Sequence, residues 1–146
     1  MADLCSRSEQ CTNDILNKLL KAGLTRNQSE EIIDFLVLEK FISDRRFAKA
    51  YANDKLRFSG WGKYKIRTGL YLKHIPSDLI TEAIDNLNED TYKEVLQKVG
   101  DSKAKGLSLT DRKNAQKLYR HLLSRGFESS DALAEVKRQI RIHKEC

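Results

Sequence analysis

The residues of this sequence with the most evident chemistry are basic ones that stand close together without acidic neighbours. The segment from Arg57 to Pro76, RFSGWGKYKIRTGLYLKHIP, contains two arginines and three lysines but no aspartate or glutamate. Arginine and lysine bind phosphates and carboxylates, and tyrosines among them can stack on bases or peptide planes. The segment therefore predicts contact with an anionic partner.

Residue spacing in this segment places cations and aromatic rings on one side of a predicted helix. We expect a helix over residues 62–73, with Ile66 and Leu70 as its buried stripe. At 100° per residue, a mixed basic and aromatic face lies beside that stripe. Its members are Lys63, Tyr64, Arg67, Tyr71 and His74. The alternative is an ordinary solvated face, with the tyrosines packed on the next helix.

Two further groups of cations complete the candidate binding surface. One follows a helix start predicted at Ser43 or Asp44, and the other lies on a helix expected between residues 110 and 126. On the second helix the cations fall within about 60° of one another, opposite the apolar residues. The whole candidate set is Arg45, Arg46, Arg57, Lys63, Tyr64, Lys65, Arg67, Tyr71, Lys73, Lys113, Lys117 and Arg120.

A single tryptophan, Trp61, stands between two glycines inside the basic segment. We expect its indole to fill part of the core at the helix start, with a role in partner contact as the alternative. Gly60 and Gly62 are expected to permit a left-handed turn and a close approach between helices, because neither has a Cβ atom.

The overall charge agrees with an anionic partner. The chain has 146 residues, a third of them charged, and a formal net charge of +6. Such a balance favours nucleic acid, an acidic protein face or an anionic membrane as the partner. Acidic residues gather elsewhere, at positions 30–39 and 78–94, so the charge is segregated along the chain.

Signatures of catalysis are missing from the sequence. It contains no phosphate-binding glycine loop, no zinc-protease motif and no nucleophile elbow, and its three histidines are isolated. Cys5, Cys11 and Cys146 form no metal-ligand spacing, which favours reduced thiols in the cytoplasm. No apolar run approaches the length of a membrane span. We therefore predict a cytoplasmic protein that is not an enzyme, needs no cofactor or metal and does not enter a membrane.

Apolar residues at helical spacing predict a series of short helices along almost the whole chain. The first ends at Gly23, and the second opens at a capping pair of Asn27 and Glu30. The second helix is apolar nearly all round, so we expect other helices to enclose it. Further helices are expected from Ser43 or Asp44, from Gly62, from Pro76, from Glu89, before Gly126 and from Ser129, with a connection at residues 101–110.

A short motif recurs about every 50 residues. KLLKAGL ends at Leu24, GLYLKHI ends at Ile75, and SRGF ends at Phe127. Each places a leucine pair or its equivalent before a glycine or histidine and a large apolar residue. We predict an all-α fold of tandem three-helix repeats that form an elongated, curved array. The expected units are residues 1–58, 59–106 and 107–146, the third being incomplete.

The segment from Phe41 to Ile84 resembles the RecX regulatory family of bacteria. The residues similar to the family's acidic cap, Phe-Ala pair and following helix are Asp44, Phe47, Ala48, Tyr51 and Arg57. Those similar to its Gly-x-x-x-(Arg/Lys)-Ile…Leu…Lys-Gly-Ile run are Gly60, Lys65, Ile66, Leu70, Lys73 and Ile75. The sequence departs from the pattern at His74, where the family has glycine, and at Lys65, where arginine is common.

The resemblance implies a modulator, usually an inhibitor, of the RecA recombinase in recombination, DNA repair and the SOS response. It implies a position along the groove of the RecA filament on single-stranded DNA, where it would block extension, ATP hydrolysis or strand exchange. We expect a monomer that binds DNA without sequence preference, on single strands and also on duplexes. A rival hypothesis is an autonomous DNA-binding protein of helix-turn-helix type, and an enzyme is a weaker third.

Overall fold

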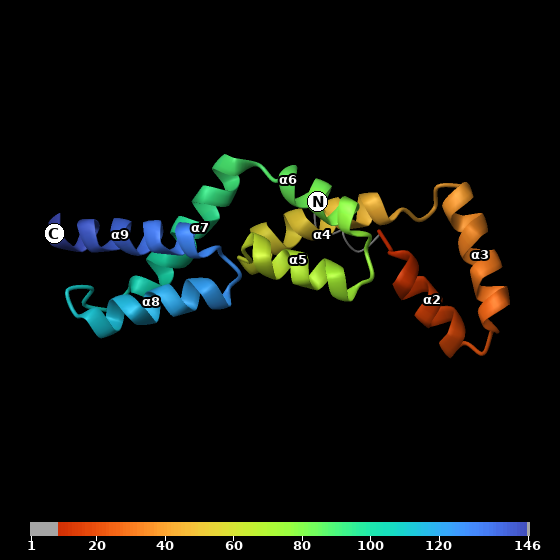
Figure 1. Ribbon diagram of the computed structural model, residues 1–146, viewed down its shortest axis with the longest axis horizontal. Coiled ribbons are helices and arrows are strands. Elements are labelled where there is room, and N and C mark those ends of the chain that lie inside the picture. Colours follow the sequence, from red (N-terminus) through yellow and green to blue (C-terminus); the bar gives the residue numbers. More distant parts are fainter. Residues whose placement is uncertain (1–8, 146) are drawn as a thin grey trace. The chain divides into compact units, whose positions relative to one another are not determined.

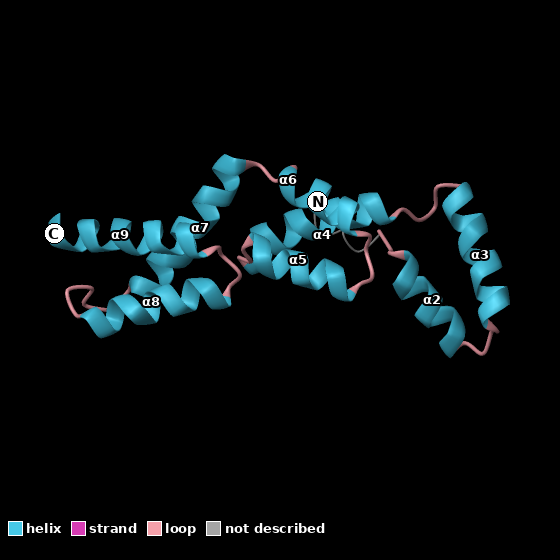
Figure 2. Ribbon diagram, in the orientation of Figure 1, coloured by secondary structure: helices cyan, strands magenta, loops and turns pink. Residues whose placement is uncertain are grey.

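The structure is a computed structural model that describes residues 9–145, and all its regular elements within that range are α-helices (Figures 1 and 2). The predicted all-α fold is confirmed. The helices are α2 (Thr12–Lys21), α3 (Arg26–Leu38), α4 (Asp44–Ser59), α5 (Lys63–Leu72), α6 (Ser77–Asp85), α7 (Glu89–Ala104), α8 (Arg112–Ser124) and α9 (Ser129–Glu145).

Contacts within the chain divide it into two compact units, which we describe separately. The first, called the α2–α6 unit, runs up to Asp54 and continues from Arg67 to Asn86. The second, called the α7–α9 unit, contains Lys55–Ile66 and the chain from Leu87 onward. Helices α4 and α5 contribute residues to both units.

The recurring sequence motif forms the same backbone turn each time. Gly23, His74 and Gly126 have φ angles of +95°, +59° and +96°. The N–H of each donates to the carbonyl three residues earlier, and the next N–H donates to the carbonyl five residues earlier. This is the Schellman arrangement, which satisfies the last carbonyls of a helix. His74 therefore keeps the left-handed geometry at the position where the family has glycine.

Lys40 ends α3 with the same pair of hydrogen bonds and a φ of +62°. In each of the four turns the following residue is large and apolar, as Phe41 is here. No glycine marks this turn in the sequence, so it was not predicted.

Helix α3 begins two residues earlier than its predicted capping pair. The Thr25 hydroxyl accepts from the Gln28 N–H at 3.2 Å, and the Gln28 side chain accepts from the Thr25 N–H at 2.9 Å. The prediction of Asn27 and Glu30 as the capping pair is wrong, because Glu30 instead forms an ion pair with Arg26 at 3.3 Å. The capping box itself follows the usual Thr-x-x-Gln pattern.

The prediction that other helices enclose α3 is also wrong for the part of the chain that the structure describes. Ser29 is the buried residue of this helix. Several large apolar side chains at its C-terminal end are exposed, including Leu38 at 78%. The others are Ile32, Phe35, Val37 and, after the helix, Phe41.

The core of the α2–α6 unit comes from α4, α5 and α6. On α5, the predicted core residue Leu70 is fully buried, and Gly69 lies so close to α4 that an added Cβ would meet the Tyr51 hydroxyl oxygen at 2.1 Å. Helix α2 is tied to this core at its start, where Asp44 accepts from the N–H and hydroxyl of Thr12. Other buried apolar residues are Ile42, Phe47, Ala48, Ala52, Ile75, Ile80, Ala83 and Ile84.

The α7–α9 unit buries apolar residues from α7, α8 and α9 and from the parts of α4 and α5 that belong to it. Tyr92 on α7 packs edge to face on Phe127, with ring centroids 5.7 Å apart. The predicted core residue Ile66 belongs to this unit and is fully buried. Its other buried apolar residues are Leu56, Leu87, Leu96, Ala104, Leu109, Leu118, Leu122, Ala132 and Val136.

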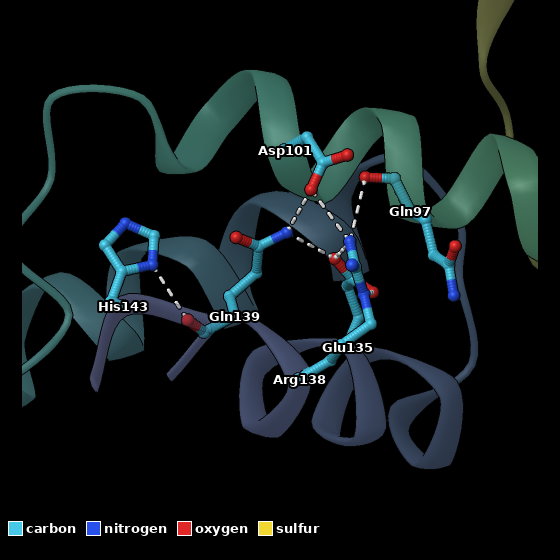
Figure 3. Close-up of polar contacts among 6 residues, drawn as sticks. All are labelled: Gln97, Asp101, Glu135, Arg138, Gln139 and His143. Atoms are coloured by element: carbon cyan, nitrogen blue, oxygen red, sulfur yellow. Dashed lines mark hydrogen bonds and ion pairs between the residues drawn. The ribbon is translucent and has the colours of Figure 1, made fainter. Parts of the chain in front are cut away.

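A polar network holds α9 against α7 (Figure 3). The Glu135 carboxylate is buried and accepts from Arg138 Nε at 2.7 Å and from Gln139 Nε2 at 2.9 Å. The same two side chains reach Asp101 on α7, at 2.8 Å and 2.6 Å. A buried carboxylate needs such donors, because it would otherwise lose its hydration without compensation.

Helix α7 extends four residues into the segment predicted as a connection. Gly100 makes room for Glu135, since a Cβ there would stand 2.0 Å from Oε2. Ala104 is buried in the same interface, and Asp101 joins the polar network. Tertiary contacts of this kind override a polar, helix-breaking composition.

Cys11 is buried as a free thiol, and burial raises its pKa to about 11. A thiol with so high a pKa is almost entirely protonated at neutral pH and is a poor nucleophile. Cys5 and Cys146 lie outside the described residues. Among the described helices, none combines the length and apolar character needed to cross a membrane.

Candidate nucleic-acid interface

The start of α5 is fixed by close packing on the turn between α8 and α9. The Gly62 N–H donates to the Arg125 carbonyl at 2.8 Å, and the Tyr64 N–H donates to the Gly126 carbonyl at 2.9 Å. A Cβ on Gly62 would stand 2.4 Å from the Gly126 backbone, and one on Gly126 would stand 2.3 Å from Lys65 Cβ. The predicted close helix approach at Gly62 is confirmed, and so is the left-handed turn at Gly60, whose φ is +66°.

Trp61 lies at this junction beside two lysines. Lys55 Nζ is 4.7 Å and Lys65 Nζ is 4.8 Å from the centroid of its ring. The ring is half-buried at the helix start, so the core interpretation of Trp61 and the partner-contact alternative both stay predictions. Lysine over an indole face is a favourable cation–π contact. Lys65, a candidate residue, therefore presents its charge next to an aromatic surface.

The Lys63 side chain is only 20% exposed, and its charged end contacts other residues of the protein. Its Nζ lies 3.0 Å from Glu89 Oε1 and 4.6 Å from the centroid of Tyr92. Its N–H donates to the Tyr92 hydroxyl at 3.0 Å. Burial raises the pKa of Tyr92 to about 12, so this hydroxyl is neutral and accepts the bond. The positive charge of Lys63 is thus compensated within the α7–α9 unit.

Lys73 is compensated in the same way inside the α2–α6 unit. Its Nζ lies 2.9 Å from Asp14 Oδ2, with the other carboxylate oxygen at 3.2 Å. The hydrogen bond to Asp14 raises the pKa of Lys73, although partial burial opposes the shift. The pair joins α5 to α2.

Arg45 and Arg46 at the start of α4 also have acidic partners. Arg45 pairs with Glu82 on α6 at 2.8 Å, and Arg46 pairs with Glu9 at 3.1 Å. Arg46 further donates to the Lys40 carbonyl at 2.8 Å. The Arg45 side chain is 59% exposed and the Arg46 side chain is 44% exposed. An ion pair that water reaches contributes little to stability, so these arginines can exchange partners.

The remaining candidate cations are exposed and form no ion pair within residues 9–145. Both candidate tyrosines are also largely exposed, Tyr64 at 66% and Tyr71 at 72%. The interpretation in which these tyrosines pack on a neighbouring helix is therefore wrong. The exposed cations are Arg57, Arg67, Lys113, Lys117 and Arg120.

Helix α8 carries the clearest basic face. Lys113, Lys117 and Arg120 follow one another at intervals of four and three residues, which puts them on one side of the helix. Leu118 and Leu122, on its other side, are fully buried. Asp111 caps the helix by accepting from the Lys113 N–H at 2.9 Å, so this acidic neighbour is engaged at the helix end.

Candidate residues fall in both units. The α2–α6 unit contains Arg45, Arg46, Arg67, Tyr71 and Lys73, and the α7–α9 unit contains Arg57, Lys63, Tyr64, Lys65, Lys113, Lys117 and Arg120. A single binding ribbon along the repeats stays a prediction.

The candidate set does not include two cations at the α5 junction, Lys55 and Arg125. Lys55 lies over the Trp61 ring, and the Arg125 guanidinium donates to the Ser59 carbonyl. The nearest signal in the sequence is the position of Arg125 next to the motif glycine Gly126. Within the described residues, no cluster of histidine, cysteine and acidic side chains is arranged to hold a metal ion.

Comparison with known protein families identifies two of the helical repeats. The model of the second three-helix domain of RecX matches residues 43–84, which contain α4 and α5 and nearly all of α6. The model of the third three-helix domain of RecX matches residues 90–134, from α7 into α9. These matches divide the chain at other positions than the predicted units 1–58, 59–106 and 107–146, which stay a prediction.

Curated relatives carry the same description. The chain is 31% identical over 125 residues to the regulatory protein RecX of Clostridium tetani, covering 83% of this chain and 56% of the relative. It is 30% identical over 124 residues to the regulatory protein RecX of Clostridium botulinum strain Eklund 17B, covering 83% and 58%. The chain thus spans less than three fifths of the length of these relatives.

Solved structures share the fold. The crystal structure of RecX from Lactobacillus salivarius superposes with a TM-score of 0.80 at 20% identity, covering 96% of this chain and 91% of that one. A crystal structure of a regulatory protein RecX gives 0.77 at 23% identity, covering 96% and 67%. The models of the second and third RecX domains match in that order along the chain, and the curated relatives agree. The chain therefore belongs to the RecX family of regulatory proteins.

Proposed function

We propose that this protein regulates the RecA recombinase by binding the RecA filament on single-stranded DNA and inhibiting its ATPase activity, extension or strand exchange. The observation that carries the proposal is the set of exposed, unpaired cations within residues 9–145, above all on α8. The protein acts as a cytoplasmic monomer without a catalytic group or cofactor of its own. It binds single-stranded and double-stranded DNA without sequence preference.

Charge and exposure support α8 as the main contact. Lys113, Lys117 and Arg120 have no acidic partner among the described residues, so binding to phosphate or carboxylate groups breaks no existing ion pair. Lys63 and Lys73 would first have to leave Glu89 and Asp14. We rank the paired residues as weaker contacts for this reason.

The test is RecA ATPase activity on single-stranded DNA at substoichiometric amounts of this protein. The variant is the triple charge reversal Lys113→Glu, Lys117→Glu and Arg120→Glu. We expect it to need at least about tenfold more protein for half inhibition, since phosphate contacts dominate such affinities. Circular dichroism checks that helicity is unchanged. Lys63→Glu is a poor probe, because it would put two carboxylates together at Glu89.

A matched control distinguishes the effect of the α8 face from the effect of a change in net charge. The triple variant Lys21→Glu, Lys49→Glu and Lys137→Glu makes the same change in charge at exposed positions on other helices. We expect less than about threefold loss from it. Equal loss in both variants would remove α8 from the proposal.

The same ATPase assay, together with binding to naked DNA, distinguishes a filament regulator from the rival helix-turn-helix protein. An autonomous helix-turn-helix protein would prefer one duplex sequence and leave the ATPase rate unchanged. A filament regulator should instead show no sequence preference on naked DNA. Its binding to single strands should weaken with a log–log salt slope of roughly 0.7 for each phosphate neutralised.

A further inference from the structure

A basic pocket lies between α7 and α8, on residues outside the predicted binding set. Its volume is about 410 Å³. Two turns of α7 and the C-terminal end of α8 line it, and no lining residue is acidic. The lining residues are Lys98, Val99, Ser102, Lys103, His121 and Arg125.

The positive charge of this pocket is not compensated from nearby. Lys98, Lys103 and Arg125 form no ion pair within residues 9–145. Asp101, the acidic residue next to Ser102, accepts instead from Arg138 and Gln139 on α9. Partial burial lowers the pKa of His121, and the charges of Lys103 and Arg125 lower it further.

Arg125 is the fixed part of the pocket. Its guanidinium donates to the Ser59 carbonyl, and its own backbone carbonyl accepts from Gly62 at 2.8 Å. A guanidinium has five N–H donors in one plane, so one bond to a carbonyl leaves others for a ligand. The lysines on α7 are exposed and can close over a group held by Arg125.

We propose that the pocket between α7 and α8 binds a phosphate group, held by Lys98, Lys103 and Arg125 with the Ser102 hydroxyl as a further donor. Phosphate fits this set because charge-assisted hydrogen bonds from arginine and lysine to its oxygens are strong. The phosphate can be a monoester or free phosphate, or a diester of a nucleic-acid backbone. The chemistry is the same, and the experiment separates the sources.

The experiment follows the His121 imidazole by NMR while an anion is added at constant ionic strength. The resonance is assigned by its loss in His121→Gln. Inorganic phosphate is one probe, and a dinucleoside monophosphate with a single internal diester is the other. We expect a saturable shift with at least one of them, and a rise in the His121 pKa at saturation, because a bound anion stabilises the imidazolium.

Variants test the named residues. Lys98→Gln with Lys103→Gln should raise the dissociation constant at least about tenfold, and Lys98→Arg with Lys103→Arg should stay within about threefold. The matched control is Lys93→Gln with Lys137→Gln, which removes two exposed charges outside the pocket, one on α7 and one on α9. It should change the constant less than about twofold. All of these positions are exposed, so the variants should fold.

Each outcome bears on the proposal. Saturation by inorganic phosphate alone supports a monoester or free phosphate as the source. Saturation by the dinucleoside monophosphate supports a backbone diester. The proposal is overturned if neither anion shifts His121 more than chloride does, or if the control variant weakens binding as much as the pocket variant. The assay contains no RecA, so its result is independent of the proposed function.

Discussion

The α2–α3 pair and the α7–α9 unit both carry apolar residues at helical spacing, but they use these residues differently. On α2 no described residue is buried, on α3 only Ser29 is, and α3 leaves Leu38 and Phe35 exposed. The α7–α9 unit buries apolar side chains from each of α7, α8 and α9 and contains the polar network around the buried Glu135 carboxylate. Periodicity thus fixes which side of a helix is apolar, whereas tertiary packing fixes whether that side is covered.

The difference lies in the residues at the contacts. In the α7–α9 unit, Gly100 admits the Glu135 side chain, and Gly126 admits the backbone at Lys65. The turn glycine of the α2–α3 pair, Gly23, has no atom within 4 Å of an added Cβ. Close packing therefore distinguishes the two regions even where the turns have the same geometry.

The largest difference in stability between the two regions is expected when an apolar residue is replaced by a charged one. Leu122→Asp puts a carboxylate at a site with 0% exposure and should cost at least about 4 kcal/mol or abolish folding of the α7–α9 unit. Leu38→Asp makes the same change at an exposed site and should stay within about 0.5 kcal/mol. Urea unfolding followed by circular dichroism measures both. Similar losses in the two variants would show that α3 is covered in solution.

The two turn glycines give the next contrast. Gly126→Ala and Gly23→Ala impose the same left-handed strain, of about 1 kcal/mol, because their φ angles agree within 1°. Only Gly126→Ala adds a clash with Lys65, so we expect a total of about 3 kcal/mol there. Urea unfolding followed by circular dichroism measures both variants, and fluorescence of Trp61, the single tryptophan, separately reports unfolding of the α7–α9 unit. Equal effects would mean that the junction relaxes freely.

Features set by neighbours along the chain were predictable from the sequence. The starts of α7 and α9 were predicted, as were the turns at Gly23 and Gly126 and the break at Gly60. Each depends on a capping residue or a glycine that acts locally. The error at Asn27 is of the same local kind, since two overlapping capping patterns compete there and Thr25 forms the complete reciprocal box with Gln28.

Features set by distant residues were not predictable. Lys63 pairs with Glu89, 26 residues away, and Lys73 pairs with Asp14, 59 residues away. Charge counts along the chain cannot show such neutralisation, so these two cations were ranked too highly. Such counts also cannot show that Arg125 and the lysines of α7 line one pocket. The exposed face of α8 was predictable, because a helix wheel needs no partner to be drawn.

Removing an ion pair in each region should give a smaller difference in the free energy of unfolding than the two glycine substitutions do. Arg138→Met removes a cation from the buried Glu135 and should cost about 2 kcal/mol, because Gln139 still donates to that carboxylate. Arg26→Met removes the exposed pair with Glu30 and should cost less than about 0.5 kcal/mol. Urea unfolding measures both. A loss of less than about 0.5 kcal/mol in the free energy of unfolding for Arg138→Met would show that water replaces the hydrogen bonds of Arg138 to Glu135.

The smallest effect is expected on the melting temperature at acidic pH, and it concerns only the α7–α9 unit. Hydrogen bonds from Gln139 and then Arg138 lower the pKa of Asp101 below its ordinary value of 3.8. A group with a lowered pKa in the folded state stabilises the fold above its ordinary pKa, and this contribution is lost as the pH falls through the lowered value. The melting temperature from Trp61 fluorescence should therefore fall more steeply below pH 4 in the wild type than in Asp101→Asn, which keeps an acceptor for Gln139 but does not titrate. Parallel pH profiles in the two proteins would mean that Asp101 does not link α9 to α7 in solution.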